Sequence, residues 1–213
     1  MPAAMLQIGE RIRAERARKG ISLRSLARSV GLSPSLISQI ETGKCQPSVS
    51  TLYAITTALG VSVQDVFGEA SEAAAPAARV AAGQVTAPAP APREGAREAG
   101  GPVVCPAQRE VLEFDSGVIW QRLGRVPGSH VDFLLVSYAP GGCSSPAGRL
   151  MQHPGTEYGY LIQGELTVAL GRQLHRLATG DAVSFASVTP HTYRNEGTVP
   201  AVGVWFVAPS DGA

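Results

Sequence analysis

Cysteine is scarce in this chain of 213 residues, and its three copies, Cys45, Cys105 and Cys143, lie far apart. No C-x-x-C pair occurs, which excludes the usual sequence patterns of zinc sites and of thiol–disulfide exchange. Isolated cysteines in an odd number fit a reducing compartment. The first residues lack the charged-then-apolar order of a secretory signal, and no apolar run is long enough to cross a bilayer. We therefore expect a soluble, cytoplasmic protein with no membrane partner.

A large net charge is also missing, because the formal value at pH 7 is only +1. The charge is nevertheless unevenly distributed along the chain. Residues 1–68 contain eight Lys or Arg and four Asp or Glu, whereas the remainder contains ten and thirteen. A basic first part followed by a mildly acidic second part indicates that only the first part faces phosphate groups.

Aromatic residues are absent from residues 69–102, where Ala, Pro, Gly and scattered charges dominate. Such a segment buries too little apolar area to offset the entropy lost on ordering. The sequence therefore predicts a flexible linker with extended Ala-Pro portions, although the alanine content leaves a helix over residues 69–82 open. This linker would separate a first domain at residues 1–68 from a second at residues 103–213.

The first domain has helical periodicity throughout. Apolar residues recur at helical spacing and predict an all-α domain of five short helices, over residues 5–19, 22–30, 33–42, 48–59 and 62–67. Ser22 and Ser33 are expected N-caps, and Pro34 suits the first turn of its helix. Gly31 and Gly60 mark helix ends. Five helices in so few residues leave a small core.

The third of these helices has two distinct faces. Its isoleucines face inward, whereas Ser35, Ser38, Gln39 and Thr42 recur at i, i+3, i+4 and i+7 on another face. Small hydroxyl groups permit close approach to the major groove of DNA, and a glutamine amide can form paired hydrogen bonds with adenine. A helix face that is merely solvated is the alternative.

The stretch from Gly20 to Pro47 resembles the helix-turn-helix of lambda-repressor-like regulators, also called the xenobiotic-response-element family. The matching residues are SLRSLA at 22–27, GLS at 31–33, ISQIETG at 37–43 and PS at 47–48. By this resemblance residues 34–42 form the recognition helix, and Glu41 pairs with Arg16, for which a phosphate contact is the alternative. The expected DNA-binding residues are Arg24, Ser33, Ser35, Leu36, Ser38, Gln39 and Lys44.

Beyond the linker the hydrophobic period changes from that of a helix to two. Short strands are predicted near residues 109–114, 118–123, 131–139, 158–163, 165–170, 173–177, 181–186, 191–196 and 201–208. Turns rich in Gly, Pro, Asn and Asp separate them, and Gln163-Gly164 joins two strands as a hairpin. Many short strands at this spacing predict an all-β antiparallel barrel or jelly roll.

Two imidazoles and one carboxylate stand out in this second part, at His153, Glu157 and His191. Such a set can hold a divalent metal ion and leave coordination positions open. The pattern resembles the two motifs of the cupin family, a double-stranded β-helix barrel, over most of residues 103–208. In that family two histidines separated by one residue, a glutamate and a later histidine bind metal. His153, Glu157 and His191 match the last three ligand places, whereas Met151 occupies the first.

The chain departs from the cupin pattern at several positions. Met151 offers a thioether, which suits copper(I) rather than zinc or iron, and Ala186 and Val188 replace the usual Pro and Gly before the last histidine. Two interpretations stay open: a metal held by three ligands, and histidines that are only hydrogen-bonded. The expected ligand-pocket residues are Met151, Tyr158, Tyr160, Phe185 and Tyr193.

A cupin barrel joined to this type of helix-turn-helix resembles the sensor half of bacterial transcription regulators. The resemblance implies a homodimer that binds a palindromic operator in double-stranded DNA, with half-sites about 34 Å apart, and a small-molecule effector in the barrel. No catalytic residue is predicted, and no cofactor apart from a divalent metal in the barrel. The alternatives are a metal-dependent dioxygenase or isomerase with an appended helical domain, and an antitoxin-like protein that binds a protein partner.

Overall fold

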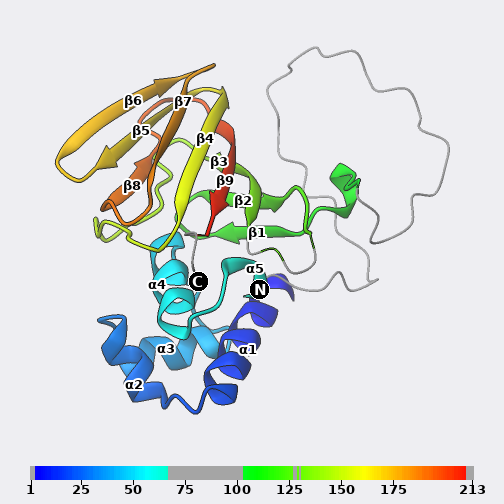
Figure 1. Cartoon of the computed structure of the whole chain (residues 1–213), viewed down its shortest axis with the longest axis vertical. Coiled ribbons are helices and arrows are strands. Elements are labelled where there is room, and N and C mark those ends of the chain that lie inside the picture. The colour runs from blue at the N-terminus through cyan, green and yellow to red at the C-terminus, as the bar shows by residue number, and fades with distance from the viewer. Residues whose placement is uncertain (1–2, 67–102, 127–128, 130, 210–213) are drawn as a thin grey trace.

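The computed structural model describes residues 3–66, 103–126, 129 and 131–209 (Figure 1). The predicted linker lies outside these residues. The chain begins with helices α1 (Ala3–Arg18), α2 (Leu23–Ser29), α3 (Pro34–Glu41) and α4 (Val49–Leu59), followed by the single turn α5 (Val63–Val66). Five short helices were predicted, and this count is too high, because the fifth amounts to a single turn of four residues.

Serine side chains fix the starts of three of these helices. Ser22 accepts the backbone N–H of Ser25, Ser33 accepts that of Leu36, and Ser48 accepts that of Thr51, at 3.1, 3.1 and 3.2 Å. Each bond satisfies one of the N–H groups that the first helical turn leaves unpaired. Gly60 ends α4 in the left-handed conformation, with φ 59°.

The second part of the chain consists of strands that pair antiparallel. A six-stranded sheet has the order β1 (Val111–Phe114), β2 (Val118–Arg122), β3 (Asp132–Tyr138), β9 (Ala201–Ala208), β4 (Thr156–Gln163) and β7 (Ala182–Ala186). A three-stranded sheet has the order β6 (Gln173–Ala178), β5 (Glu165–Leu170) and β8 (His191–Arg194). A one-turn 3-10 helix, η1 (Pro106–Gln108), precedes β1. All nine predicted strands are present, and the prediction of an antiparallel barrel or jelly roll is confirmed.

Side chains alternate between the interior and the outer surface along the central strands. In β4, Glu157, Gly159 and Leu161 are buried, whereas Tyr158 and Tyr160 are exposed. Strand pairing continues this parity onto β9, where Trp205 lies opposite Gly159 and Phe206 lies opposite Tyr158. Because side chains have a period of two in a strand, register alone decides which residues face the barrel interior.

The helical part is in direct contact with one end of the barrel. Figure 1 shows α4 lying between the barrel and the other helices. The backbone N–H of Ser50, in the first turn of α4, donates to the carbonyl oxygen of Ser144 in the barrel at 3.0 Å. Buried side chains of both parts belong to one apolar cluster. The described residues thus join the two parts through packing as well as through the chain.

None of the helices in the described part of the chain combines the length and apolar character that are needed to span a membrane.

Candidate functional site

The outer face of α3 is open to solvent. Ile37 and Ile40 are fully buried in the helical core. Ser35, Ser38 and Gln39 are exposed on the opposite side of the same helix. Within the described part of the chain, nothing packs over these hydroxyl and amide groups, so they are available to contact base edges.

Basic side chains flank this face. Arg24 and Arg28 on α2 and Lys44 just after α3 are exposed, and no ion pair involves them among the described residues. Unpaired cations beside an exposed polar helix are the arrangement that phosphate contacts require.

Two of the predicted DNA contacts also have structural tasks. The Ser33 hydroxyl accepts the N–H of Leu36 and so caps α3. The Leu36 side chain is partly buried and packs against the core. Ser33 therefore caps the helix while it is itself exposed, and Leu36 packs against the core. The other predicted contacts are also exposed: Arg24, Ser35, Ser38, Gln39 and Lys44.

The predicted pairing of Arg16 with Glu41 is present. Arg16 Nε donates to Glu41 Oε1 at 2.5 Å and Nη2 donates to Oε2 at 2.9 Å, while Nη1 reaches the carbonyl oxygen of Ile21. Burial lowers and the Glu41 hydrogen bond raises the pKa of Arg16, and the hydrogen bond has the larger effect. The alternative of a phosphate contact for Arg16 is wrong, because its guanidinium is used inside the domain.

The barrel brings His153, Glu157 and His191 together, as the sequence pattern predicts. Their ligand atoms all lie within 4.8 Å of one another, and all three residues are buried. His153 Nε2 and His191 Nε2 each lie 2.9 Å from Glu157 Oε1. Glu157 comes from β4 and His191 from β8, while His153 lies on the segment before β4.

The two ring nitrogens of each histidine have different surroundings. His153 Nδ1 lies 3.2 Å from the carbonyl oxygen of Pro154, and His191 Nδ1 lies 2.8 Å from that of Thr189. A carbonyl oxygen only accepts, so each Nδ1 carries a proton, and an imidazole in its neutral form then presents its lone pair at Nε2. Both Nε2 atoms and Glu157 Oε1 are buried without a hydrogen-bond partner. Three lone-pair donors that converge in this way fit a cation, so the residues present fit a divalent metal.

Neighbouring side chains hold the Glu157 carboxylate in place. The Tyr193 hydroxyl donates to Glu157 Oε2 at 2.6 Å, and Trp205 Nε1 donates to the Tyr193 hydroxyl at 3.2 Å. Burial raises the pKa of Glu157, whereas hydrogen bonds from His153 and His191, which form when their Nε2 atoms are protonated, lower it to about 2. Glu157 is therefore ionised, with one oxygen anchored and the other directed at the imidazoles.

A small cavity adjoins the cluster. It is lined by Val49, Tyr53, Trp120, Leu134, Val136, Tyr138, Met151, Glu157, Tyr193, Trp205 and Val207. The volume that the centre of a water molecule can occupy there is about 20 Å³. This volume suffices for one or two waters and is far smaller than a small-molecule ligand needs.

The predicted pocket residues separate into two groups. Met151 and Tyr193 line the cavity, and the Met151 backbone pairs with that of His191 in an isolated bridge. Tyr158 and Tyr160 are 50% and 52% exposed on the outer face of the large sheet, so their placement in the pocket is wrong. Phe185 is half-buried and meets the His191 ring edge-to-face at 5.0 Å, outside the cavity lining.

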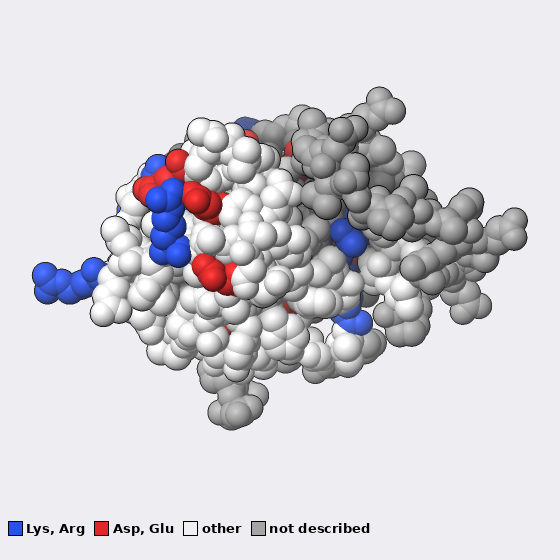
Figure 2. Space-filling view, turned by 90° about the horizontal axis from the view of Figure 1, so that it is seen from above, with Lys and Arg blue, Asp and Glu red and all other residues white. Residues whose placement is uncertain are grey.

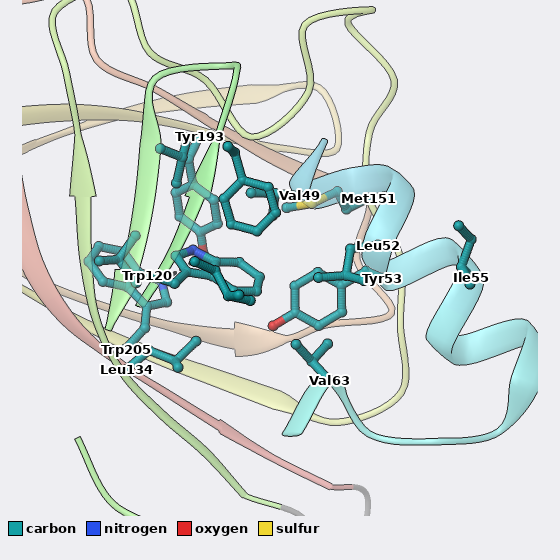
Figure 3. Close-up of a cluster of buried hydrophobic side chains, with 14 of the residues drawn as sticks. Val49, Leu52, Tyr53, Ile55, Val63, Trp120, Leu134, Met151, Tyr193 and Trp205 are labelled. Atoms are coloured by element: carbon teal, nitrogen blue, oxygen red, sulfur yellow. Dashed lines mark hydrogen bonds between the residues drawn. The ribbon is translucent and has the colours of Figure 1, made fainter. Parts of the chain in front are cut away.

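Sequence reasoning missed the contribution of the helical part to this cavity. Val49 and Tyr53 on α4 are lining residues (Figure 3). The Tyr53 ring is stacked on His153, with ring centroids 4.1 Å apart and planes 5° apart, and it meets Trp120 edge-to-face at 5.7 Å. One signal existed: Tyr53 is the only aromatic residue in residues 1–66, and it lies off the apolar stripe of Leu52, Ile55 and Leu59.

The end of the barrel that points away from the helices has few charged side chains. Figure 2 shows this end, with small patches of both signs on a largely uncharged surface. Among the described residues seen in this view, nothing resembles the basic surface beside α3.

Two family models match the chain, the helix-turn-helix domain over residues 7–66 and the cupin domain over residues 134–207. The HTH-type transcriptional regulator PuuR of Escherichia coli (strain K12) is 25% identical over 189 residues, which cover 88% of this chain and 86% of that protein. The immunity repressor protein of Bacillus phage phi105 is 38% identical over 64 residues, which cover 30% of this chain and 44% of the repressor.

Among solved structures, an HTH_3 family transcriptional regulator from Vibrio cholerae is similar along almost the whole chain. The TM-score is 0.64 at 20% identity, and the match covers 96% of both chains. The two proteins therefore share a fold.

Proposed function

Because this chain is a helix-turn-helix transcriptional regulator with a cupin domain, we propose that it binds a specific operator in double-stranded DNA through α3. The observation that carries the proposal is the exposed face of Ser35, Ser38 and Gln39, with exposed basic residues on the neighbouring helix α2 and just after α3. Gln39 would discriminate bases, and Arg24 and Lys44 would contact phosphates. We also propose that the DNA-binding domain comprises residues 1–68, that the cupin domain comprises residues 103–213, and that the protein acts in the cytoplasm.

Binding to a palindromic operator needs two copies of the chain, since a two-fold symmetric site is read by two recognition helices. The outer face of the large sheet is suited to this contact. On its three adjacent strands β3, β9 and β4 the exposed side chains are apolar or aromatic: Phe133, Tyr158, Tyr160, Ile162 and Phe206. An apolar patch of this kind usually marks an interaction surface, and a second copy would cover it with the same residues.

The barrel is proposed to sense a small molecule, with a divalent metal held by His153, Glu157 and His191. A metal there would supply positive charge and open coordination positions to a ligand. The protein residues would position that ligand: Tyr193 and Trp205 fix Glu157, and the aromatic walls of the cavity would contact the ligand.

A binding role is favoured over the enzymatic alternative. The two histidines and the glutamate of the cluster are also compatible with a metal-dependent dioxygenase or isomerase. However, the cavity is filled largely by aromatic and aliphatic side chains, and Glu157, its one acidic lining residue, is already used by the imidazoles. The antitoxin-like alternative leaves this buried polar cluster without a purpose.

The test is selection of duplexes from a random pool by the full chain, followed by titration of a selected palindrome and of a scrambled duplex. A regulator binds the selected duplex far more tightly than the scrambled one, with a difference that persists as salt is raised. Equal affinity for both duplexes at every salt concentration would overturn the proposal.

A further inference from the structure

Helix α4 contributes to the packing of both parts of the molecule. Leu52, Ile55 and Leu59 are buried in the helical core. Val49 and Tyr53, which are one turn apart on another side of the helix, line the barrel cavity. A rigid helix shared in this way transmits any displacement at one of its faces to the other.

Tyr53 makes the contacts that a bound aromatic ligand would make. It is only 8% exposed, its ring covers His153 in parallel, and its edge contacts Trp120. Figure 3 shows the ring pointing from α4 towards Trp205 and Tyr193. Stacking and edge-to-face contacts of this kind depend on a flat ring and are worth more than apolar burial alone.

The cavity has no room for an effector while Tyr53 is in place. Its free space of about 20 Å³ admits one or two waters. The other aromatic lining residues stand on barrel strands that are fixed by backbone pairing, such as Trp120 on β2 and Trp205 on β9. Tyr53 lies on helix α4 instead, so its ring can move out of the cavity without breaking the backbone pairing of a sheet.

Displacement of Tyr53 would reach the DNA-binding surface by a short route. The N–H of Ser50 is bonded to the carbonyl oxygen of Ser144, and Ser144 is bonded through its backbone and its hydroxyl to Tyr193. These bonds fasten the first turn of α4 to β8. An occupant that unseats α4 therefore changes how the helices sit on the barrel and, in a dimer, how far apart the two recognition helices lie.

We propose that Tyr53 is an internal occupant of the barrel cavity, and that the effector is a small aromatic molecule that displaces its ring and moves α4. The inference deepens the proposed regulator function and rests on it. An aromatic ring is the class of ligand that can replace the stack on His153 and the contact with Trp120. Effector and DNA binding are then coupled, because the two positions of α4 bind DNA unequally.

The test uses p-cresol, which is the tyrosine side chain as a free molecule, and the full-length chain. Calorimetry measures p-cresol binding, and a selected palindromic duplex reports DNA affinity with and without p-cresol. The proteins are the wild type, Tyr53→Ala and Tyr53→Phe, with Tyr53→Leu as a second ring-free variant if the alanine variant folds poorly. Arg11→Gln is the control for a general loosening between the two parts, because Arg11 on α1 lies near Glu110 and Arg122, away from the cavity.

The two ring-free variants should bind one p-cresol per chain at least about tenfold more tightly than the wild type, which must first expel Tyr53. In the wild type, Tyr53→Phe and Arg11→Gln, saturating p-cresol should shift duplex affinity. In the ring-free variants p-cresol should bind and leave duplex affinity unchanged, because nothing ties the occupant to α4.

Three results would overturn the inference: p-cresol that binds the wild type as tightly as the ring-free variants or binds neither, a wild type whose duplex affinity ignores bound p-cresol, or a shift that persists without the Tyr53 ring. Failure of every protein to prefer the selected duplex would instead count against the proposed function. The comparison of p-cresol affinities would then still decide whether Tyr53 fills the site.

Discussion

The Arg16 guanidinium and the Glu41 carboxylate form a two-point ion pair that ties α1 to the end of α3. Glu41 is 4% exposed and Arg16 is 14% exposed. The pair therefore fixes the position of the end of α3 relative to α1.

Replacement of Arg16 by alanine should destabilise the helical part by about 3 kcal/mol, because it leaves a buried carboxylate without its cation. The value lies at the low end of the range for buried pairs, since Arg16 reaches solvent. Thermal unfolding followed by circular dichroism measures the change. Arg18→Ala removes the exposed pair with Glu15 and should leave the midpoint where it is; equal losses in both variants would contradict a special role for Arg16.

The two kinds of DNA contact should be separable by mutation. Gln39→Ala should lose discrimination between bases while affinity for random duplexes stays nearly unchanged. Lys44→Ala should weaken binding to all sequences alike and reduce the slope of log affinity against log salt by about one unit. Titrations of selected and scrambled duplexes over a range of salt concentrations measure both effects. Identical behaviour of the two variants would refute the assignment of roles.

The cluster in the barrel should bind a divalent metal, and the chain offers a gain-of-function test. Wild-type protein should take up one Co²⁺ or Zn²⁺ per chain, and His191→Ala should lose it. Met151→His should tighten binding by about tenfold or more, because a third imidazole beside the cluster adds a good ligand for these ions. Metal content after dialysis and Co²⁺ absorption spectra are the measurements. His175→Ala, which changes an exposed histidine on β6, is the control and should bind metal like the wild type.

The proposed dimer contact predicts a change of oligomeric state. Tyr160→Lys places a charge in the apolar outer face of the large sheet, where a second copy would bury it. Light scattering should show a monomer, and affinity for a palindromic duplex should fall while a half-site is still bound. Leu174→Lys alters a residue that is 75% exposed on the small sheet and should stay dimeric. A Tyr160→Lys protein that remains dimeric would place the contact elsewhere.

Local signals in the sequence were sufficient for the helices and strands, and the cupin-like motif was sufficient to find the cluster of His153, Glu157 and His191. Serine caps and glycine stops gave the helices, and alternation with turn residues gave the strands, because both depend on neighbours in the chain. The error at Tyr158 and Tyr160 came from choosing pocket residues by aromatic type. Strand parity counted from the inward Glu157 places Tyr158 and Tyr160, at odd offsets, on the outer face.

The role of Tyr53 could not be derived in the same way. Its partners, His153 and Trp120, belong to the barrel, and the contact depends on how the helices seat against that end. Such a contact between distant segments leaves only an indirect trace in the sequence, here an aromatic residue off the apolar stripe of its own helix.

The close packing of Gly159 against Trp205 gives a last prediction. A Cβ atom at Gly159 would lie 2.7 Å from Trp205 Cε2 and 2.8 Å from Cζ2. Gly159→Ala must therefore displace the indole, which donates to the Tyr193 hydroxyl that holds Glu157. We expect a loss of about 1–3 kcal/mol in stability. Tryptophan emission should shift as well, since both tryptophans of the chain line the cavity. Gly124→Ala, whose added atom meets its nearest neighbour at 3.7 Å, should show neither effect. An unchanged emission spectrum in Gly159→Ala would mean that the indole does not depend on this glycine for its position.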